Sequence, residues 1–453
     1  MFKKSTIKDR VLGNDFLKDV LSIGGGKLIS QIISMFSIPI LSRIFDPSVF
    51  GDQQIVVSAA TIILSFVNLG LGSSIMAAED ENEAKELFVT STVIMTAITA
   101  LIISGIYFFN ATDAILNVSK GNGYELLILA AYIVFFNLST NLSILANRFG
   151  KNRLLLVNPI VNSVCNLAIA VPLGLLGFGY EGVMLASIVG LAIAVIQMGV
   201  RLRPIPATYS RLILVGNFKK YVNYIKFQSA AGLLGTASQQ MPTQVLSRMF
   251  DNSTLVGNYS MCVNLVNYPI SLIGNPISTA YFRKASTLYR QNGGLFDDVS
   301  DFSYSIVKRL LMLTTIPVCI YIWLGTPLVK FVLGDAWELA GEISVILIYP
   351  YVLGFCATCI TYCRVSIGKQ KVNLLISVIK VIITAGGFAF AAIAKFEFVQ
   401  TVSVYAITLA IGHILDMGAS FYIMKKNYIK YVKCVAISST VCVSILIIQL
   451  ISQ

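Results

Sequence analysis

The sequence has few charged residues: 12% of its 453 residues are Asp, Glu, Lys or Arg, whereas 56% are hydrophobic. A soluble protein carries about a quarter of its residues as charged side chains to cover its surface. The composition therefore excludes a soluble protein. Long polar segments are missing too, because the loops between apolar runs hold fewer than roughly 25 residues, which is too short for a separate soluble domain.

Apolar runs of about 20 residues, the length that a bilayer-spanning helix requires, recur along the whole chain. The alternation at period two that strands of a transmembrane barrel show is absent. We predict an all-α polytopic membrane protein with twelve or thirteen transmembrane helices. The candidate helices are 18–44, 53–76, 87–109, 124–147, 154–176, 181–202, 221–249, 254–282, 304–325, 341–366, 371–394, 398–424 and 432–450.

Basic residues outnumber acidic ones by 34 to 22, but their positions argue against a nucleic-acid partner. Most lie in short loops between apolar runs, where they set the orientation of a membrane protein. With the N-terminus in the cytoplasm, the N-terminal segment and alternate loops hold 27 of the 34 Lys and Arg residues. Two lie inside helices, and the opposite loops hold only Arg43, Lys120, Arg248, Lys330 and Lys395. We therefore expect a cytoplasmic N-terminus.

A short motif occurs twice, as LSRIFDPSVFG over 41–51 and as LSRMFDNSTLVG over 246–257. The copies end the first and the seventh candidate helix, so both cross the bilayer in the same direction. Such a parallel repeat predicts two pseudo-symmetric six-helix lobes around a central cavity, the arrangement of an alternating-access transporter. The alternative is two unrelated interface anchors of similar composition. The predicted parts are an N-terminal lobe over 1–205, a C-terminal lobe over 206–425 and an extra helix over 426–453.

Three candidate helices carry polar side chains at spacings of three and four residues, which place them on one helical face. Hydroxyl and amide groups that face lipid lack partners, so these stripes turn toward other helices or toward water. For any single residue, a hydrogen bond between helices is the alternative. Together the stripes favour a wet cavity, and the residues assigned to it are Gln31, Ser34, Gln239, Gln240, Asn264, Asn267 and Asn275.

Few ionisable residues lie near the middle of candidate helices: Lys27, Lys380, His413 and Asp416. An unpaired charge in hydrocarbon costs at least about 2.5 kcal/mol, so each is a functional candidate. Lys27 follows three glycines, which permit bending or close backbone approach. His413 and Asp416 lie one helical turn apart, where a proton can pass between them. The alternative for Asp416 is an ion pair with Lys380 that neutralises both.

The repeated motif contributes two arginines, Arg43 and Arg248, at the outer ends of the first and seventh helices. Arginines at such positions often extend toward the lipid headgroups. The second interpretation is a symmetric pair of guanidinium groups at the mouth of the cavity. An aspartate follows each arginine after three residues and could hold it as part of a gate.

Four segments together resemble a known group of membrane proteins. They are IPILSRIFDPSVFGDQQIV (38–56), NRFGKNR (147–153), FGYEGVMLAS (178–187) and VLGDAWELAG (332–341). Their order and spacing resemble bacterial polysaccharide exporters and O-antigen flippases of the Wzx type. These belong to the multidrug/oligosaccharidyl-lipid/polysaccharide exporter superfamily. A thirteenth helix departs from the twelve-helix pattern that is commonest in this group.

The resemblance implies a flippase of the bacterial inner membrane rather than an enzyme, without catalytic residues, metal or cofactor. Its substrate would be an undecaprenyl-pyrophosphate-linked oligosaccharide that moves from the cytoplasmic to the periplasmic leaflet. The resemblance leaves open a contact with the polysaccharide polymerase and chain-length machinery. The cavity residues named above would contact the sugars. Asp416 and His413 would couple transport to H⁺ or Na⁺, and the candidates for binding the pyrophosphate are Lys27, Lys380, Arg43, Arg248 and Arg283.

Two other functions remain open at this point. A related exporter of small cationic molecules would be expected to have an acidic cavity, whereas the buried ionisable residues include Lys27 and Lys380 against one Asp. An integral membrane polysaccharide polymerase or glycosyltransferase would need a sizeable outer loop with paired carboxylates, and the predicted outer loops are short.

The distribution of basic residues predicts the orientation of the loops. Reporter domains fused after Asn117 and Asp335 should be found in the periplasm, and those fused after Lys151 and Arg290 in the cytoplasm. Activity of a periplasm-dependent reporter such as alkaline phosphatase measures this directly. A reversed location at two of the four sites would contradict the predicted topology.

Overall fold

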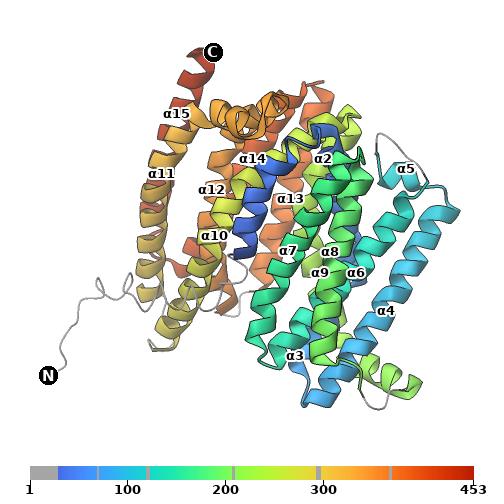
Figure 1. Ribbon diagram of the computed structural model, residues 1–453. Helices are drawn as coiled ribbons and strands as arrows, with labels where there is room; N and C mark the ends of the chain where they lie inside the picture. The colour runs from blue at the N-terminus through green and yellow to red at the C-terminus, as the bar shows by residue number, and fades with distance from the viewer. Residues whose placement is uncertain are drawn as a thin grey trace. The chain divides into compact units, whose positions relative to one another are not determined.

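The computed structural model describes residues 29–68, 71–118, 123–206, 210–291, 297–366 and 370–452, and the regular structure in this part is helical (Figure 1). Each of the thirteen predicted helices has a counterpart, which confirms the all-α prediction. The first is seen over Ile29–Leu41. The others are α2 (Pro47–Val67) with α3 (Leu71–Ala77), α4 (Glu81–Phe108), α6 (Glu125–Arg148), α7 (Asn152–Leu175), α8 (Tyr180–Leu202), α9 (Arg211–Phe250), α10 (Ser253–Gln291), α11 (Asp297–Leu333), α12 (Glu338–Ser366), α13 (Gln370–Ile393), α14 (Phe398–Met424) and α15 (Tyr428–Ser452).

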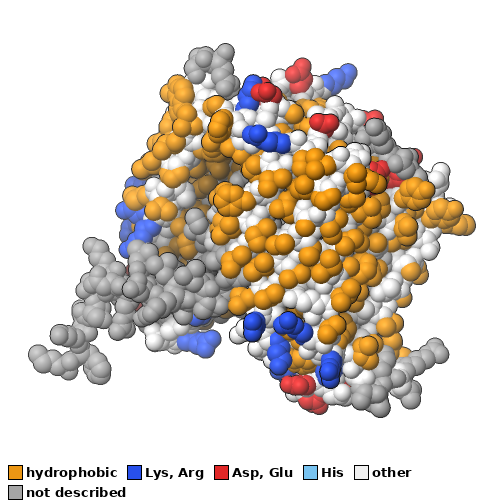
Figure 2. Space-filling view, in the orientation of Figure 1, with side chains coloured by type: hydrophobic (Ala, Val, Ile, Leu, Met, Phe, Trp, Pro, Cys, Tyr) orange, Lys and Arg blue, Asp and Glu red, His pale blue; other side chains and the backbone are white. Residues whose placement is uncertain are grey.

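Ten helices of the described part are long and apolar enough to cross a membrane, and α15 is one of them. The described part also contains two very short helices that connect longer ones: α5 (Thr112–Ile115), and the 3-10 turn η1 (Asp335–Trp337) before α12. The surface agrees with a membrane location. Over α7 and α8, hydrophobic side chains cover the middle of the face shown in Figure 2, while charged side chains gather toward the ends of the helices.

Several helices continue beyond the ends that hydropathy predicts. α10 ends at Gln291 rather than at 282, and α11 begins at Asp297 rather than at 304. The segment after 282 carries Arg and Lys, which are good helix formers, so α10 leaves the apolar region without ending. Asp297 and Asp298 lie in the first turn of α11, where the helix dipole favours acidic side chains. The prediction of these ends was therefore wrong, and Arg283 lies on a helix rather than in a loop.

The chain forms two compact units. One spans Ile29–Met261, and its largest core cluster brings α2, α4, α6 and α8 together around residues such as Val56, Met95, Ile133 and Met184. The other holds the described residues from Cys262 onward, with a core built from α10, α11, α12, α14 and α15. This division groups α9 with the helices before it. The lobe boundary at 205 stays a prediction.

The two copies of the repeated motif meet in the first unit, where α2 and α10 begin. A Cβ atom added to Gly51 would collide with the carbonyl oxygen of Ser253, and one added to Gly257 would collide with that of Pro47. Each glycine thus lies against the first residue of the other helix. The buried Asp52 accepts a hydrogen bond from the Ser253 hydroxyl beside this contact. The contact is reciprocal, as expected for two copies related by approximate twofold symmetry.

The last helix, α15, is bound to the second unit by hydroxyl groups. The Tyr349 hydroxyl of α12 lies 2.8 Å from the Ser439 hydroxyl, and Thr315 of α11 lies 3.0 Å from Ser438. Tyr431 donates a hydrogen bond of 2.7 Å to the carbonyl oxygen of Ile414 in α14. Because such bonds cannot be exchanged for bonds to water in hydrocarbon, they fix α15 against three neighbouring helices.

Candidate functional site

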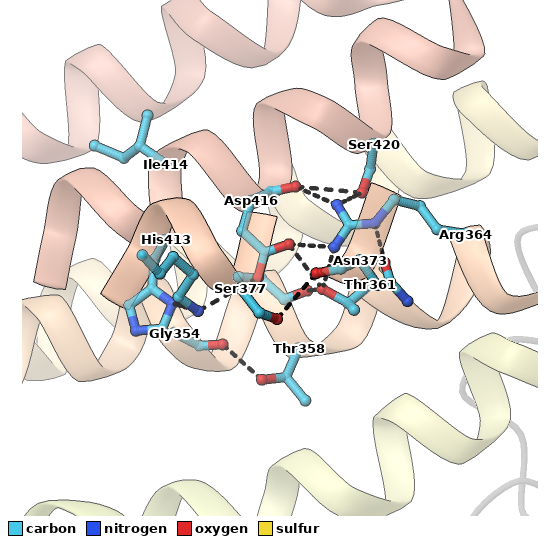
Figure 3. Close-up of polar contacts among 12 residues, drawn as sticks. Gly354, Thr358, Thr361, Arg364, Asn373, Ser377, His413, Ile414, Asp416 and Ser420 are labelled. Atoms are coloured by element: carbon cyan, nitrogen blue, oxygen red, sulfur yellow. Dashed lines mark hydrogen bonds and ion pairs between the residues drawn. The ribbon is translucent and has the colours of Figure 1, made fainter. Parts of the chain in front are cut away.

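The described residues of the second unit contain a buried cluster of charged and polar side chains, and α12, α13 and α14 contribute to it (Figure 3). In each helix the polar residues are three or four positions apart, so they share one face. These three faces meet. The members are Thr361 and Arg364 of α12, Asn373, Ser377 and Lys380 of α13, and His413, Asp416 and Ser420 of α14.

Arg364 is the centre of this cluster, and only 1% of its surface is exposed. Its Nε donates to the side-chain oxygen of Asn373 at 2.5 Å. One terminal nitrogen donates to the backbone oxygen of Asp416 at 2.6 Å and to the Ser420 hydroxyl at 2.8 Å. The other donates to Thr361 at 3.3 Å and forms an ion pair with the Asp416 carboxylate. A guanidinium group has five N–H donors, and here each has an acceptor.

Asp416 is 8% exposed and lies between two cations. Its Oδ1 accepts hydrogen bonds from Arg364 and, at 3.2 Å, from Thr361. Its Oδ2 lies 3.5 Å from the Nζ of Lys380. A buried carboxylate is tolerated only when it is paired and hydrogen-bonded. The described contacts meet both conditions, and Arg364 supplies the closer of the two cations.

Lys380 and His413 form the opposite end of the cluster. The Lys380 Nζ lies 3.4 Å from the His413 Nδ1, which can accept a hydrogen from an ammonium group only in the neutral imidazole. Two glycines make room for these side chains. A Cβ on Gly354 would come within 2.7 Å of the His413 Nε2, and one on Gly412 within 3.2 Å of the Lys380 Cγ.

The charges of the cluster do not cancel. Besides His413, the cluster contains two basic side chains, Arg364 and Lys380, and one acidic side chain, Asp416. One net positive charge therefore remains in a largely buried position. Such a site suits an anion, because a further cation would add to the excess. Arg and Lys bind phosphate groups as well as carboxylates through charge-assisted hydrogen bonds, so a phosphate group fits such a site.

Three of the predicted site residues, Lys380, His413 and Asp416, are thus brought together, and the open alternative of a Lys380–Asp416 ion pair is observed. Arg364 was missed as a site residue. It lies close to the end of the candidate helix 341–366, on the side that the predicted topology places in the cytoplasm, where basic residues are common. Its spacing of three from Thr361, on a face that also carries Thr358, is the signal that could have identified it.

The remaining cationic candidates are distributed elsewhere. Lys27 lies outside the described residues, and Arg43, Arg248 and Arg283 have exposed side chains. Arg248 donates to the backbone oxygen of Ala114 at 2.7 Å and to the side chain of Gln244 at 2.7 Å. In the described contacts, the Asp251 carboxylate accepts a hydrogen bond from Asn117 at 2.9 Å. A gate built from the arginine and aspartate pairs therefore stays a prediction.

The polar stripes have mixed surroundings. The Ser30 and Ser34 hydroxyls lie 2.8 and 3.4 Å from the Ser163 hydroxyl of α7, so these two residues bond helix to helix. Gln239 is exposed. The others with described side chains, Gln31, Gln240, Asn264 and Asn267, are partly exposed, and the side chain of Asn275 lies outside the described part. Their assignment to sugars stays a prediction.

Comparison with known proteins gives a family match. Residues 40–341 match the family model described as polysaccharide biosynthesis protein. This segment covers two thirds of the chain and includes both copies of the repeated motif. A search of curated proteins found no match.

Solved structures of transporters share the fold. The lipid II flippase MurJ in an inward closed conformation superposes with a TM-score of 0.70 at 13% sequence identity, over 93% of this chain and 97% of MurJ. An inward-facing multidrug resistance transporter of the MATE family, from the MOP superfamily, gives a TM-score of 0.62 at 15% identity, over 89% of this chain and 96% of the transporter. An outward-facing MATE transporter gives 0.58 at 14% identity, over 93% and 98%. The fold implied by the resemblance to the multidrug/oligosaccharidyl-lipid/polysaccharide exporter superfamily is confirmed.

Proposed function

Since this chain belongs to the polysaccharide biosynthesis protein family, we propose that it is a flippase for a lipid-linked oligosaccharide. In this proposal it moves an undecaprenyl-pyrophosphate-linked repeat unit of O-antigen or a related surface polysaccharide from the cytoplasmic to the periplasmic leaflet of the bacterial inner membrane. The family match is the observation that carries the proposal. The fold supports it, because MurJ, a lipid II flippase by its name, has the same fold.

The charge of the buried cluster also supports this substrate. A pyrophosphate is an anion, and the group around Arg364, Lys380 and Asp416 has one positive charge in excess. Arg364 lies near the end of α12, which the predicted topology places on the cytoplasmic side. A pyrophosphate entering from the cytoplasmic leaflet would meet this side first. The same excess of positive charge disfavours the alternative of a MATE-like exporter of small cations, since a cationic substrate would be repelled.

Transport by alternating access would require the outer ends of α2 and α10 to separate. In the structure they are held at Gly51 and Gly257, where each helix touches the backbone of the other. The hydrogen bond between Asp52 and Ser253 adds a polar contact at the same place. We propose that this contact closes the periplasmic side while the substrate binds, and that it breaks for release.

A disulfide across this contact should stop transport. In the double variant Asp52→Cys and Ser253→Cys, oxidation should reduce delivery of the lipid-linked oligosaccharide to the outer leaflet at least tenfold, and dithiothreitol should restore it. Accessibility of the sugar to a lectin added to spheroplasts measures delivery. The matched control is Thr315→Cys with Ser438→Cys, a hydroxyl pair within the second unit, where cross-linking should leave delivery unchanged. Full delivery with the first pair cross-linked would refute alternating access at this contact, and no delivery by the unmodified protein would refute the flippase.

For the pyrophosphate, we propose binding by Lys27 together with Lys380. Lys27→Ala should lower complementation of surface-polysaccharide synthesis at least tenfold, because it removes a cation that stabilises the bound pyrophosphate. A tenfold loss corresponds to about 1.4 kcal/mol of binding free energy. Lys27→Arg should keep part of the activity. Lys330→Ala, an exposed lysine that pairs with Glu338, is the control and should complement fully. Full complementation by Lys27→Ala at normal expression would remove Lys27 from the site.

For ion coupling, we propose that Asp416 is the acidic group and that His413 modulates its proton affinity. Asp416→Asn should abolish the dependence of transport on an imposed proton or sodium gradient, while the protein stays in the membrane. Transport assays in vesicles with and without each gradient measure this dependence. Asp301→Asn is the control, because Asp301 is an exposed acid near the beginning of α11 that pairs with Lys426. Unchanged gradient dependence in Asp416→Asn would leave Asp416 as a structural partner only.

A further inference from the structure

The two cations of the buried cluster are held very differently. The side chain of Arg364 is 2% exposed, and each of its five N–H groups has an acceptor. The side chain of Lys380 is 22% exposed. Its ammonium group has three N–H donors, but its contacts with Asp416 and His413 are 3.5 and 3.4 Å long. Hydrogen bonds from a charged nitrogen to a carboxylate are normally about 2.7 to 2.9 Å long, so Lys380 is loosely bound.

Arg364 alone is sufficient to neutralise Asp416. It bonds both the carboxylate and the backbone oxygen of that residue, and it cannot lose its own proton. Removing Lys380 from Asp416 would therefore not leave a buried carboxylate without a countercharge. Movement of the Lys380 ammonium group away from Asp416 therefore does not carry the large free-energy cost of an unpaired buried charge.

The surroundings of Lys380 also permit movement. Its aliphatic stem crosses α14 at Gly412, where there is no side chain to block it. The ammonium group has donor capacity that its two long contacts do not use. Phosphate oxygens, which accept charge-assisted hydrogen bonds at about 2.7 to 2.9 Å, would use this capacity better than Asp416 and His413 do.

We propose that Arg364 is a positioning residue: by neutralising Asp416 it leaves Lys380 free to bind a phosphate group of the substrate. This inference rests on the proposed function, in which the substrate carries a pyrophosphate. Arg364 itself is not a phosphate ligand in this arrangement, because its donors are occupied and its side chain is buried. Without Arg364, Lys380 would be the one cation among the described residues that is paired with Asp416, and the phosphate would have to compete with a carboxylate for it.

Binding of farnesyl pyrophosphate to the purified full chain in detergent tests this inference. Arg364→Gln should weaken binding at least tenfold, because Asp416 then captures Lys380. The double variant Arg364→Gln with Asp416→Asn should bind within about threefold of the unmodified protein, since both the carboxylate and its partner are gone. Asp416→Asn alone should bind at least as tightly as the unmodified protein. Thermal unfolding verifies that each variant is folded. If Arg364→Gln does not fold, the double variant and Asp416→Asn still test the inference.

A matched control separates this role from a simple effect of net charge. The double variant Lys380→Gln with Asp416→Asn has the same net charge as the unmodified cluster and as the double variant at Arg364 and Asp416. If net charge alone governs binding, all three should bind equally. We expect the variant without Lys380 to bind at least tenfold more weakly, because it lacks the phosphate ligand.

The outcomes distinguish the inference from the proposed function. If the unmodified protein does not bind the pyrophosphate probe, the proposed phosphate site fails and the inference with it. If the unmodified protein binds but Arg364→Gln binds equally well, only the role of Arg364 is overturned. A folded double variant at Arg364 and Asp416 that stays as weak as Arg364→Gln would likewise overturn it, as would a tenfold loss in Asp416→Asn. The positioning role is supported only if Arg364→Gln weakens binding of the probe and the added Asp416→Asn substitution restores it.

Discussion

A charge inside a membrane protein must have a countercharge and a full set of hydrogen bonds, and this constraint governs the packing of α12, α13 and α14. Breaking a buried ion pair by removing one partner costs about 3 to 5 kcal/mol. The ion pair between Arg364 and Asp416 therefore sets how these helices can be arranged, since a shift of either helix by one turn would separate the pair. The glycines at 354 and 412 follow from the same requirement, because larger side chains would displace His413 and Lys380.

The helices around the cluster are held by contacts of another kind. Apolar side chains provide little driving force between helices in lipid, so small residues and hydrogen bonds decide which helices associate. The hydroxyl groups of Tyr349, Thr315 and Ser438 act in this way between α11, α12 and α15. The second unit thus combines one costly ionic centre with several modest neutral bonds. This combination makes a rigid support for a lysine that is itself weakly held.

The sequence was sufficient for the helical class and for most helices, because charge clusters and apolar runs mark where a chain enters and leaves a membrane. It also singled out Lys380, His413 and Asp416, which the structure brings together, since an ionisable residue inside an apolar run is conspicuous. Arg364 could not be recognised in the same way. It stands near a helix end, where arginine commonly extends to the headgroups, and only the packing of three helices shows that it turns inward. Helix ends were misjudged for a related reason: hydropathy reports the extent of the membrane, whereas backbone hydrogen bonding decides the extent of the helix.

The contact between the two repeated segments has a consequence for how the sequence can diverge. Gly51 and Gly257 each face a backbone carbonyl group, not a side chain. A clash with a side chain can be relieved when a smaller residue replaces the larger one. A clash with a backbone carbonyl group cannot be relieved in this way, because every residue has that group. Second-site suppressors of a substitution at either glycine should therefore not arise at the opposing residue. They would have to shift a whole helix, and the two glycines are expected to tolerate change less than the charged residues around them.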